Sequence, residues 1–221
     1  VGSVVLSPEG AVLAEAANAR EAEHDPTAHA EIRALRAAGA ALGDSHLDGC
    51  TLVVTLEPCN HQGRTGPCVQ ALLDAGVAEV IYAQDDPTEQ AGGGAAALEA
   101  AGVRVRRGLC SQDAARLNRP WLLAVTRGRP MVTWKLAATL DGRIAAADGT
   151  SQWITPVAAR HDAHRLRRQC DAIMVGTGTA LADDPALTVR DEAGQPAPAH
   201  LQPLRVVIGS RSLPATSRVL A

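Results

Sequence analysis

The 221-residue sequence contains no phenylalanine, and aromatic residues make up only 2% of it. Its formal net charge is −3, so it also lacks the basic excess of a protein dedicated to nucleic-acid binding. Nor does it hold an apolar run long enough to span a bilayer, or a recognisable signal peptide. We therefore expect neither a nucleic-acid partner nor insertion into a membrane.

The most informative pattern in the sequence combines a histidine, a glutamate and two cysteines. His29 and Glu31 stand two positions apart, and Cys59 and Cys68 follow farther along the chain. One imidazole and two thiolates are a ligand set for catalytic zinc, which leaves a fourth position for water. Zinc lowers the pKa of that water from about 16 to about 7, and a nearby free carboxylate can carry its proton to a leaving amine. The pattern predicts a zinc-dependent deaminase with Glu31 as general acid and base.

The spacing of the cysteines narrows the class of substrate that this deaminase would accept. Eight residues separate Cys59 from Cys68, whereas nucleic-acid and nucleoside deaminases usually have two residues between these ligands. The inserted loop contains His61, Arg64 and two glycines, which suits it to an anionic substrate. Two alternatives stay open at this point: three buried residues without a metal, and a structural zinc, which would normally need a fourth Cys or His ligand.

The cysteine count bears on the cellular compartment. The chain has five cysteines, at positions 50, 59, 68, 110 and 170. An odd number, with two of them assigned to a metal, favours a reducing compartment over a disulfide framework. We therefore expect a cytoplasmic protein.

The first half of the chain alternates short strands with helices, which is typical of α/β architecture. Thr27 is the predicted N-cap of the first helix, so that His29 and Glu31 fall in its first turn. Gly92–Gly94 is predicted to be a flexible loop, with a phosphate cradle as a weaker alternative. The strands are expected at 1–6, 11–17, 51–56, 80–83 and 103–107, and the helices at 28–41, 68–75 and 95–101.

The pattern changes after a helical, basic connection at 112–127. A strand is expected at 131–136, a helix at 156–169 with Pro156 as its first residue, and strands at 171–175 and 204–208. Two domains, 1–117 and 130–221, are therefore predicted, with a linker at 118–129. Because the sequence opens inside a strand and stops without a polar tail, we expect a fragment that lacks both termini.

Four segments together resemble one known family, the bifunctional deaminase/reductase of riboflavin biosynthesis. The first runs from Glu57 to Cys68 and resembles that family's zinc loop. The others, at 135–143, 151–155 and 175–190, are similar to its reductase half. The resemblance implies a cytidine-deaminase-like three-layer α/β/α domain followed by an incomplete dihydrofolate-reductase-like α/β domain.

The resemblance also implies functions. The first domain would deaminate 2,5-diamino-6-(5-phosphoribosylamino)pyrimidin-4-one with zinc, and the second would reduce the ribosyl group to ribityl with NADPH. By position, the resemblance makes His29, Cys59 and Cys68 the zinc ligands and Glu31 the proton shuttle. Substrate contacts in the deaminase domain would be His61, Arg64 and Asp86.

In the second domain the resemblance implies two further groups of residues. The NADPH contacts would be Ala137, Trp153, Thr179, Asp183 and Ser210. The substrate contacts would be Ser151, Arg167, Leu187 and Arg190. Family members also tend to associate through the reductase half, which implies a homo-oligomer.

Two other functions compete with this expectation. One is a zinc deaminase of a nucleoside, base or tRNA joined to an unrelated second domain, which the long loop between the cysteines disfavours. The other is a non-catalytic zinc scaffold, which would keep its function after Glu31→Gln.

Overall fold

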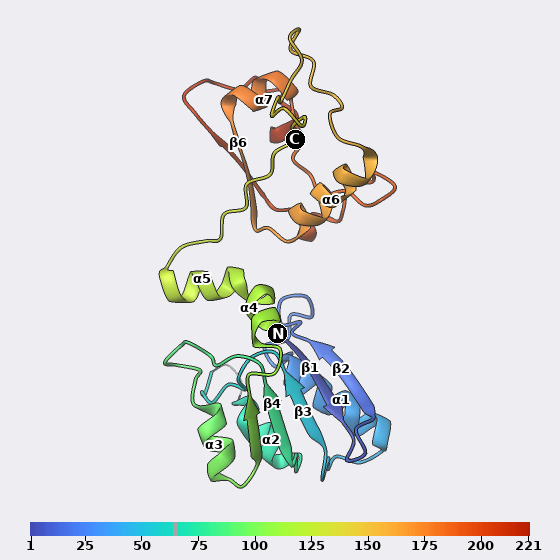
Figure 1. Cartoon of the computed structure of the whole chain (residues 1–221), viewed down its shortest axis with the longest axis vertical. Helices are drawn as coiled ribbons and strands as arrows, with labels where there is room; N and C mark the ends of the chain where they lie inside the picture. Colours follow the sequence, from blue (N-terminus) through green and yellow to red (C-terminus); the bar gives the residue numbers. More distant parts are fainter. Residues whose placement is uncertain (64–65) are drawn as a thin grey trace. The chain divides into compact units, whose positions relative to one another are not determined.

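The computed structural model describes residues 1–63 and 66–221, which form two compact units, Val1–Val132 and Thr133–Ala221. Each unit is α/β, as expected (Figure 1). The expected linker at 118–129 is mostly helix α5 (Arg119–Arg127), which follows α4 (Ser111–Leu117) within the first unit. The predicted boundaries at 117 and 130 stay a prediction.

A five-stranded sheet in the order β2-β1-β3-β4-β5 forms the frame of the first unit. The β1–β2 hairpin and the β1–β3 pair are antiparallel, whereas β3, β4 and β5 are parallel. Parallel neighbours place their carboxyl ends at one edge, where ligands of open α/β sheets bind. The strands are β1 (Gly2–Leu6), β2 (Val12–Ala17), β3 (Thr51–Val54), β4 (Glu79–Tyr82) and β5 (Arg104–Arg107).

Three helices share a single core with this sheet. They are α1 (Ala30–Leu42), α2 (Cys68–Asp74) and α3 (Gly94–Ala100). Buried Leu35, Leu72 and Leu98, one from each helix, pack with strand residues such as Leu52 and Val80. Aliphatic side chains fill this core in a chain without phenylalanine, and Tyr82 is its one large aromatic member.

Helix α1 begins later than the sequence predicted. His29 is the N-cap residue, with φ −65° and ψ 149°, and the helix starts at Ala30. The prediction of Thr27 as N-cap was wrong, because the Thr27 hydroxyl bonds to the Asp25 carboxylate 2.7 Å away instead of to the helix. Glu31 therefore lies in the first turn, as expected, while His29 stands just outside it.

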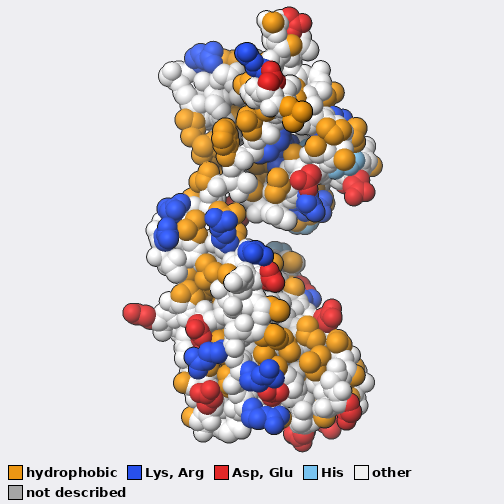
Figure 2. Space-filling view, viewed as in Figure 1, with side chains coloured by type: hydrophobic (Ala, Val, Ile, Leu, Met, Phe, Trp, Pro, Cys, Tyr) orange, Lys and Arg blue, Asp and Glu red, His pale blue; other side chains and the backbone are white. Residues whose placement is uncertain are grey.

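The second unit contains a two-stranded parallel sheet, β6 (Ala172–Gly176) beside β7 (Leu204–Ile208). Helix α6 (Val157–Arg168) precedes β6, and α7 (Thr177–Asp183) follows β6 directly. Pro156, predicted to be the first helical residue, is the N-cap of α6, so the helix begins one position later than predicted. Hydrophobic side chains lie on the surface of this unit, including Met174, Leu204 and Ile208 (Figure 2).

The strand predicted at 131–136 does not form. These residues adopt no regular structure, and Val132 and Trp134 are more than four-fifths exposed. A strand needs a hydrogen-bonded neighbour for its backbone groups. The second unit's described sheet contains only β6 and β7, so a β-rich composition alone does not produce a strand here.

Candidate active site

Three potential metal ligands converge at the carboxyl edge of the first sheet. His29 immediately precedes α1, Cys59 lies in the segment after β3, and Cys68 is the first residue of α2. The Nδ1 atom of His29 is 3.3 Å from the Cys68 sulfur and 4.0 Å from the Cys59 sulfur. All three donor atoms lie within 4.8 Å of one another, and both cysteines are buried. The sequence motif therefore folds into one site.

The spacing of these atoms fits a tetrahedral zinc ion. Zinc–sulfur bonds of about 2.3 Å and zinc–nitrogen bonds of about 2.0–2.1 Å place neighbouring ligand atoms roughly 3.5–3.8 Å apart. The two measured nitrogen–sulfur distances, 3.3 and 4.0 Å, lie on either side of that range. Three protein ligands with a fourth position free are the arrangement of a catalytic zinc, not of a structural one.

Protonation of the free ligands favours a thiolate at Cys59. Hydrogen bonds from the Cys68 thiol, from His29 and from the Cys68 backbone N–H lower the pKa of Cys59 to about 4. Donating to Cys59, together with burial, raises the pKa of Cys68. The hydrogen bond with Cys59 raises the pKa of His29. Burial and the positive charge of Arg20 oppose this rise. The two cysteines therefore differ: their surroundings favour the thiolate at Cys59 and the thiol at Cys68.

Glu31 is a buried carboxyl group beside these ligands, with only 4% of its surface exposed. Burial is the main reason that its pKa is raised. A carboxyl group with a raised pKa exchanges a proton nearer neutral pH than an exposed glutamate does. Glu31 therefore has the properties of a proton carrier, and it stands in the first turn of α1, two residues from His29.

The sequence motif assigns no role to Glu57, but in the structure this residue anchors the segment that carries Cys59. Its carboxylate accepts hydrogen bonds from the backbone N–H groups of Ala95 at 2.9 Å and Asp86 at 3.2 Å. Gly94 lies against the same segment, where an added Cβ would stand 1.9 Å from the Pro58 carbonyl oxygen. The predicted loop is present at Gly92 and Gly93, whereas Gly94 is already the first residue of α3, where the lack of a side chain allows this close contact.

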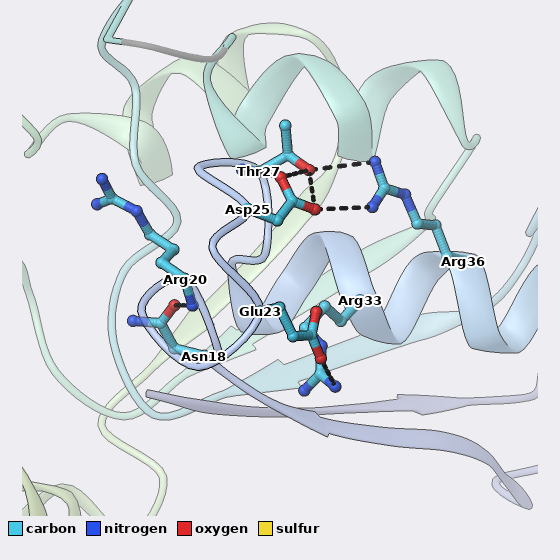
Figure 3. A network of polar contacts seen from close by, with 7 residues as sticks. All are labelled: Asn18, Arg20, Glu23, Asp25, Thr27, Arg33 and Arg36. Carbon is cyan, nitrogen blue, oxygen red and sulfur yellow. Dashed lines mark hydrogen bonds and ion pairs between the residues drawn. The ribbon is translucent and has the colours of Figure 1, made fainter. Parts of the chain in front are cut away.

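The loop between β2 and α1 is fixed by ion pairs (Figure 3). Arg33 pairs with Glu23 at 2.7 Å and also donates to the Ala17 carbonyl oxygen at 2.6 Å. Arg36 lies 3.9 Å from the Asp25 carboxylate. This loop delivers His29 to the site, so the ion pairs position a metal ligand indirectly.

The three predicted substrate contacts of the first unit, His61, Arg64 and Asp86, lie in different local surroundings where the structure describes them. His61 is half-buried, and its Nδ1 atom is buried without a hydrogen-bond partner among the described residues. The Asp86 carboxylate accepts bonds from the backbone N–H of Thr88 at 2.9 Å and from its hydroxyl at 2.6 Å. Arg64 lies outside the described residues. These three roles stay predictions.

A groove of about 970 Å³ runs between α1 and α2 and reaches His29 and Cys68. Its walls include Ile32 and Leu35 from α1 and Ala71 from α2. The volume is within the usual range for sites of small organic ligands. His29 and Cys68, two of the three candidate ligands, therefore line a groove that is open to the outside.

In the second unit, two of the predicted substrate contacts form a basic cluster with a histidine. Arg167 donates to the Thr188 carbonyl oxygen at 3.1 Å, and the Arg190 backbone N–H donates to His164 Nδ1 at 3.2 Å. Burial and the charge of Arg190 lower the pKa of Arg167. No carboxylate pairs with either arginine in the described parts of the chain. Buried Leu187 lies between them in sequence, three residues before Arg190.

The remaining predicted contacts of the second unit are spread over several segments. Ser151 and Trp153 line a pocket of about 590 Å³, and the Arg160 guanidinium lies 4.5 Å from the Trp153 ring centre. The others are half-buried Ala137 and exposed Thr179, Asp183 and Ser210. Thr179 and Asp183 belong to α7, and Ser210 follows β7. Their roles stay predictions.

Comparison with known proteins assigns each unit to a class. Residues 1–84 match the family model described as the cytidine and deoxycytidylate deaminase zinc-binding region. Residues 130–221 match the model of the RibD C-terminal domain. The chain therefore joins a deaminase-type zinc-binding domain to a RibD-type C-terminal domain.

Full-length similarity identifies the family. The riboflavin biosynthesis protein RibD of Mycobacterium tuberculosis is 52% identical over 221 residues, which is all of this chain and 62% of that protein. A deaminase/reductase structure from Thermotoga maritima has a TM-score of 0.86 at 34% identity, and RibD of Acinetobacter baumannii has 0.83 at 38%. Both matches cover 99% of this chain and 59% of the other. The chain belongs to the RibD family of riboflavin biosynthesis proteins and spans about three-fifths of the length of these relatives.

Proposed function

We propose that the first unit deaminates 2,5-diamino-6-(5-phosphoribosylamino)pyrimidin-4-one with the help of zinc, as a step in riboflavin synthesis. The observation that carries this proposal is the convergence of His29, Cys59 and Cys68 beside buried Glu31. This donor set supports hydrolysis of an aromatic amine, and membership of the RibD family supports the substrate.

In this proposal the three ligands hold zinc through the His29 imidazole and two sulfurs. Bound zinc supplies Lewis acidity, which brings the pKa of a water molecule to about 7. Cys59 enters the site as a thiolate, so one ligand needs no deprotonation when the metal binds. Cys68 gives up its proton on metal binding, which makes zinc affinity fall with decreasing pH.

Glu31 accounts for the movement of protons. Its buried carboxylate takes a proton from the attacking water and delivers it to the leaving amino group. The raised pKa lets one side chain act as base and then as acid near neutral pH. Glu31 stays free of the metal in this scheme, because three other residues supply the ligand set.

We further propose that the second unit belongs to an NADPH-dependent reductase that converts the ribosyl side chain to ribityl. NADPH supplies the hydride, and the proposed cofactor contacts are Ala137, Trp153, Thr179, Asp183 and Ser210. Arg167 and Arg190, which have no carboxylate partner among the described residues, would hold the anionic end of the substrate. Ser151 and Leu187 are the other proposed substrate contacts of this unit.

Location and partners complete the proposal. We place the protein in the cytoplasm, which agrees with five cysteines that are all free. A homo-oligomer through the second unit is supported by its exposed apolar residues, such as Met174 and Leu204. No nucleic-acid partner is proposed. Among the described residues, no helix has the length and apolar character needed to cross a bilayer.

The deciding experiment measures ammonia release from three compounds: the phosphoribosylamino pyrimidine, cytidine and adenosine. The zinc-loaded chain is expected to deaminate only the first. Activity confined to the nucleosides would overturn the substrate assignment and leave a zinc deaminase of another class. NADPH oxidation in the presence of the deaminated product tests the reductase part separately.

A further inference from the structure

The loop from Asn18 to Ala28 contains Arg20, whose guanidinium forms no ion pair among the described residues. Of the arginines around this loop, Arg33 pairs with Glu23 and Arg36 pairs with Asp25. Arg20 has no such partner in residues 1–63 and 66–221 (Figure 3). Its side chain points away from both carboxylates in that view.

The position of Arg20 is nevertheless fixed by its backbone. Its N–H donates to the Asn18 side-chain oxygen at 3.4 Å, and its carbonyl oxygen accepts from the Asp25 N–H at 3.2 Å. The side chain is half-buried, and its Nε atom is fully buried without a hydrogen-bond partner among the described residues. Buried donors in native proteins are nearly always paired, so an unpaired one points to a missing acceptor.

The missing acceptor belongs at the candidate deaminase site. Ala19, the residue before Arg20, donates its backbone N–H to the carbonyl oxygen of Ala28 at 2.9 Å, and Ala28 immediately precedes His29, a proposed zinc ligand. His61, in the loop that follows Cys59, likewise has a buried nitrogen without a partner in the described structure. Two unpaired nitrogen atoms, each in a segment that carries a zinc ligand, indicate that a polar ligand completes the site.

We propose that Arg20 is a substrate-binding residue of the deaminase and pairs with the phosphate of its substrate. This inference rests on the proposed function. A planar guanidinium matches a phosphate bidentately, and the deaminase substrate carries one negatively charged group of this kind. Because Arg20 is half-buried and its Nε atom is enclosed, the pairing costs less additional ordering than it would for a fully exposed side chain.

The test compares Arg20→Gln and Arg20→Lys with the parent chain on the phosphorylated substrate and on its dephosphorylated ribosylamino form. For Arg20→Gln, the KM for the phosphorylated substrate should rise about ten- to a hundredfold, the typical effect of losing a charged hydrogen bond. The KM for the dephosphorylated form, kcat and zinc content should stay near their parent values. Lysine should restore part of the affinity, because it meets phosphate as a point charge.

Binding of ribose 5-phosphate, measured by calorimetry, provides a readout that does not depend on turnover. Arg20→Gln should weaken this binding by a similar factor. Arg104→Gln, a change of equal charge at an exposed position on edge strand β5, is the control and should alter neither measurement.

Two results would overturn the inference and leave the proposed function standing. One is an equal change in KM for both substrate forms, or no change in either. The other is a fall in zinc content, which would mean that Arg20 supports the zinc site and not the substrate phosphate. If the parent chain deaminates neither form, the proposed function fails together with the inference.

Discussion

The Oε1 atom of Glu57 accepts a hydrogen bond from the backbone N–H of Ala95 at 2.9 Å, across 38 residues of sequence. Its other oxygen accepts from the N–H of Asp86. One buried carboxylate thereby ties the Cys59 segment to the start of α3 and to the loop after β4. Glu57 thereby helps to position Cys59, a proposed zinc ligand, without being one itself.

Glu57→Gln should therefore destabilise the first unit. The amide keeps one acceptor but turns an NH₂ group toward a backbone N–H, which leaves a buried donor unpaired. The expected loss is roughly 1–3 kcal/mol, measured as the free energy of unfolding in denaturant. Glu99→Gln, on the same helix α3 and exposed, is the matched control and should have almost no effect.

Glu31→Gln should abolish deamination and retain the metal. Loss of a general acid and base lowers rates by roughly a hundred- to ten-thousandfold. Zinc content should be unchanged, because His29, Cys59 and Cys68 remain. Steady-state kcat and metal analysis on the same preparation check both parts. A variant that keeps its rate of deamination would contradict the role of Glu31 as proton carrier.

Substitution of a proposed ligand should remove the metal as well as the activity. Cys68→Ser removes a sulfur donor that lies 3.3 Å from His29 Nδ1, so zinc content and deamination should fall together. Cys50→Ser changes a buried cysteine outside this cluster and should keep the metal. Metal analysis after dialysis against a chelator makes the comparison. Equal retention of zinc in both variants would contradict the ligand assignment.

Gly94→Ala should strain the contact between α3 and the Cys59 segment. The new Cβ would stand 1.9 Å from the Pro58 carbonyl oxygen, so the backbone has to shift. Overpacking of this kind typically costs about 1–3 kcal/mol, here with a loss of zinc affinity. The control is Gly2→Ala, whose added Cβ makes only an ordinary contact at 3.9 Å. Equal thermal midpoints for the two variants would contradict the packing role.

Stability of the second unit should depend on pH through His164. Burial, with the charges of Arg167 and Arg190, lowers the pKa of this imidazole, which accepts the Arg190 N–H bond in its neutral form. Below the ordinary value of about 6.5, the unfolded chain takes up a proton that the folded chain resists, so stability falls with decreasing pH. Thermal unfolding at pH 7.5 and 5.5 measures this loss. His164→Gln should reduce it, whereas exposed His161→Gln should not.

The ligand set could be predicted from sequence because zinc chemistry fixes both residue type and order. His29, Cys59 and Cys68 were assigned without coordinates, and they meet in the structure. The bonds of Glu57 could not be predicted, since its partners are backbone groups 29 and 38 residues away. The proposed role of Arg20 could not be predicted from the sequence for a related reason. Only the fold shows that Arg33 and Arg36 are paired and that Arg20 has no ion-pair partner among the described residues.

Local rules failed where the tertiary context decided the outcome. Thr27 has the chemistry of a helix cap, but the Asp25 carboxylate lies nearer and takes its hydroxyl. The residues at 131–136 have strand composition but no partner strand in the described sheet. Gly94 belongs to the predicted glycine loop by composition, yet it begins α3, where the Pro58 carbonyl oxygen leaves no room for a side chain.

The three ligands also have a mechanical consequence for the chain. His29 is separated from Cys59 by 30 positions and from Cys68 by 39. A bound ion acts as a cross-link that closes loops of these lengths and lowers the entropy of the unfolded chain. A covalent cross-link over the longer span would contribute roughly 4 kcal/mol in the chain-entropy treatment. Zinc thus fastens the helices and the sheet of this unit together, so loss of the ion costs conformational stability as well as chemistry.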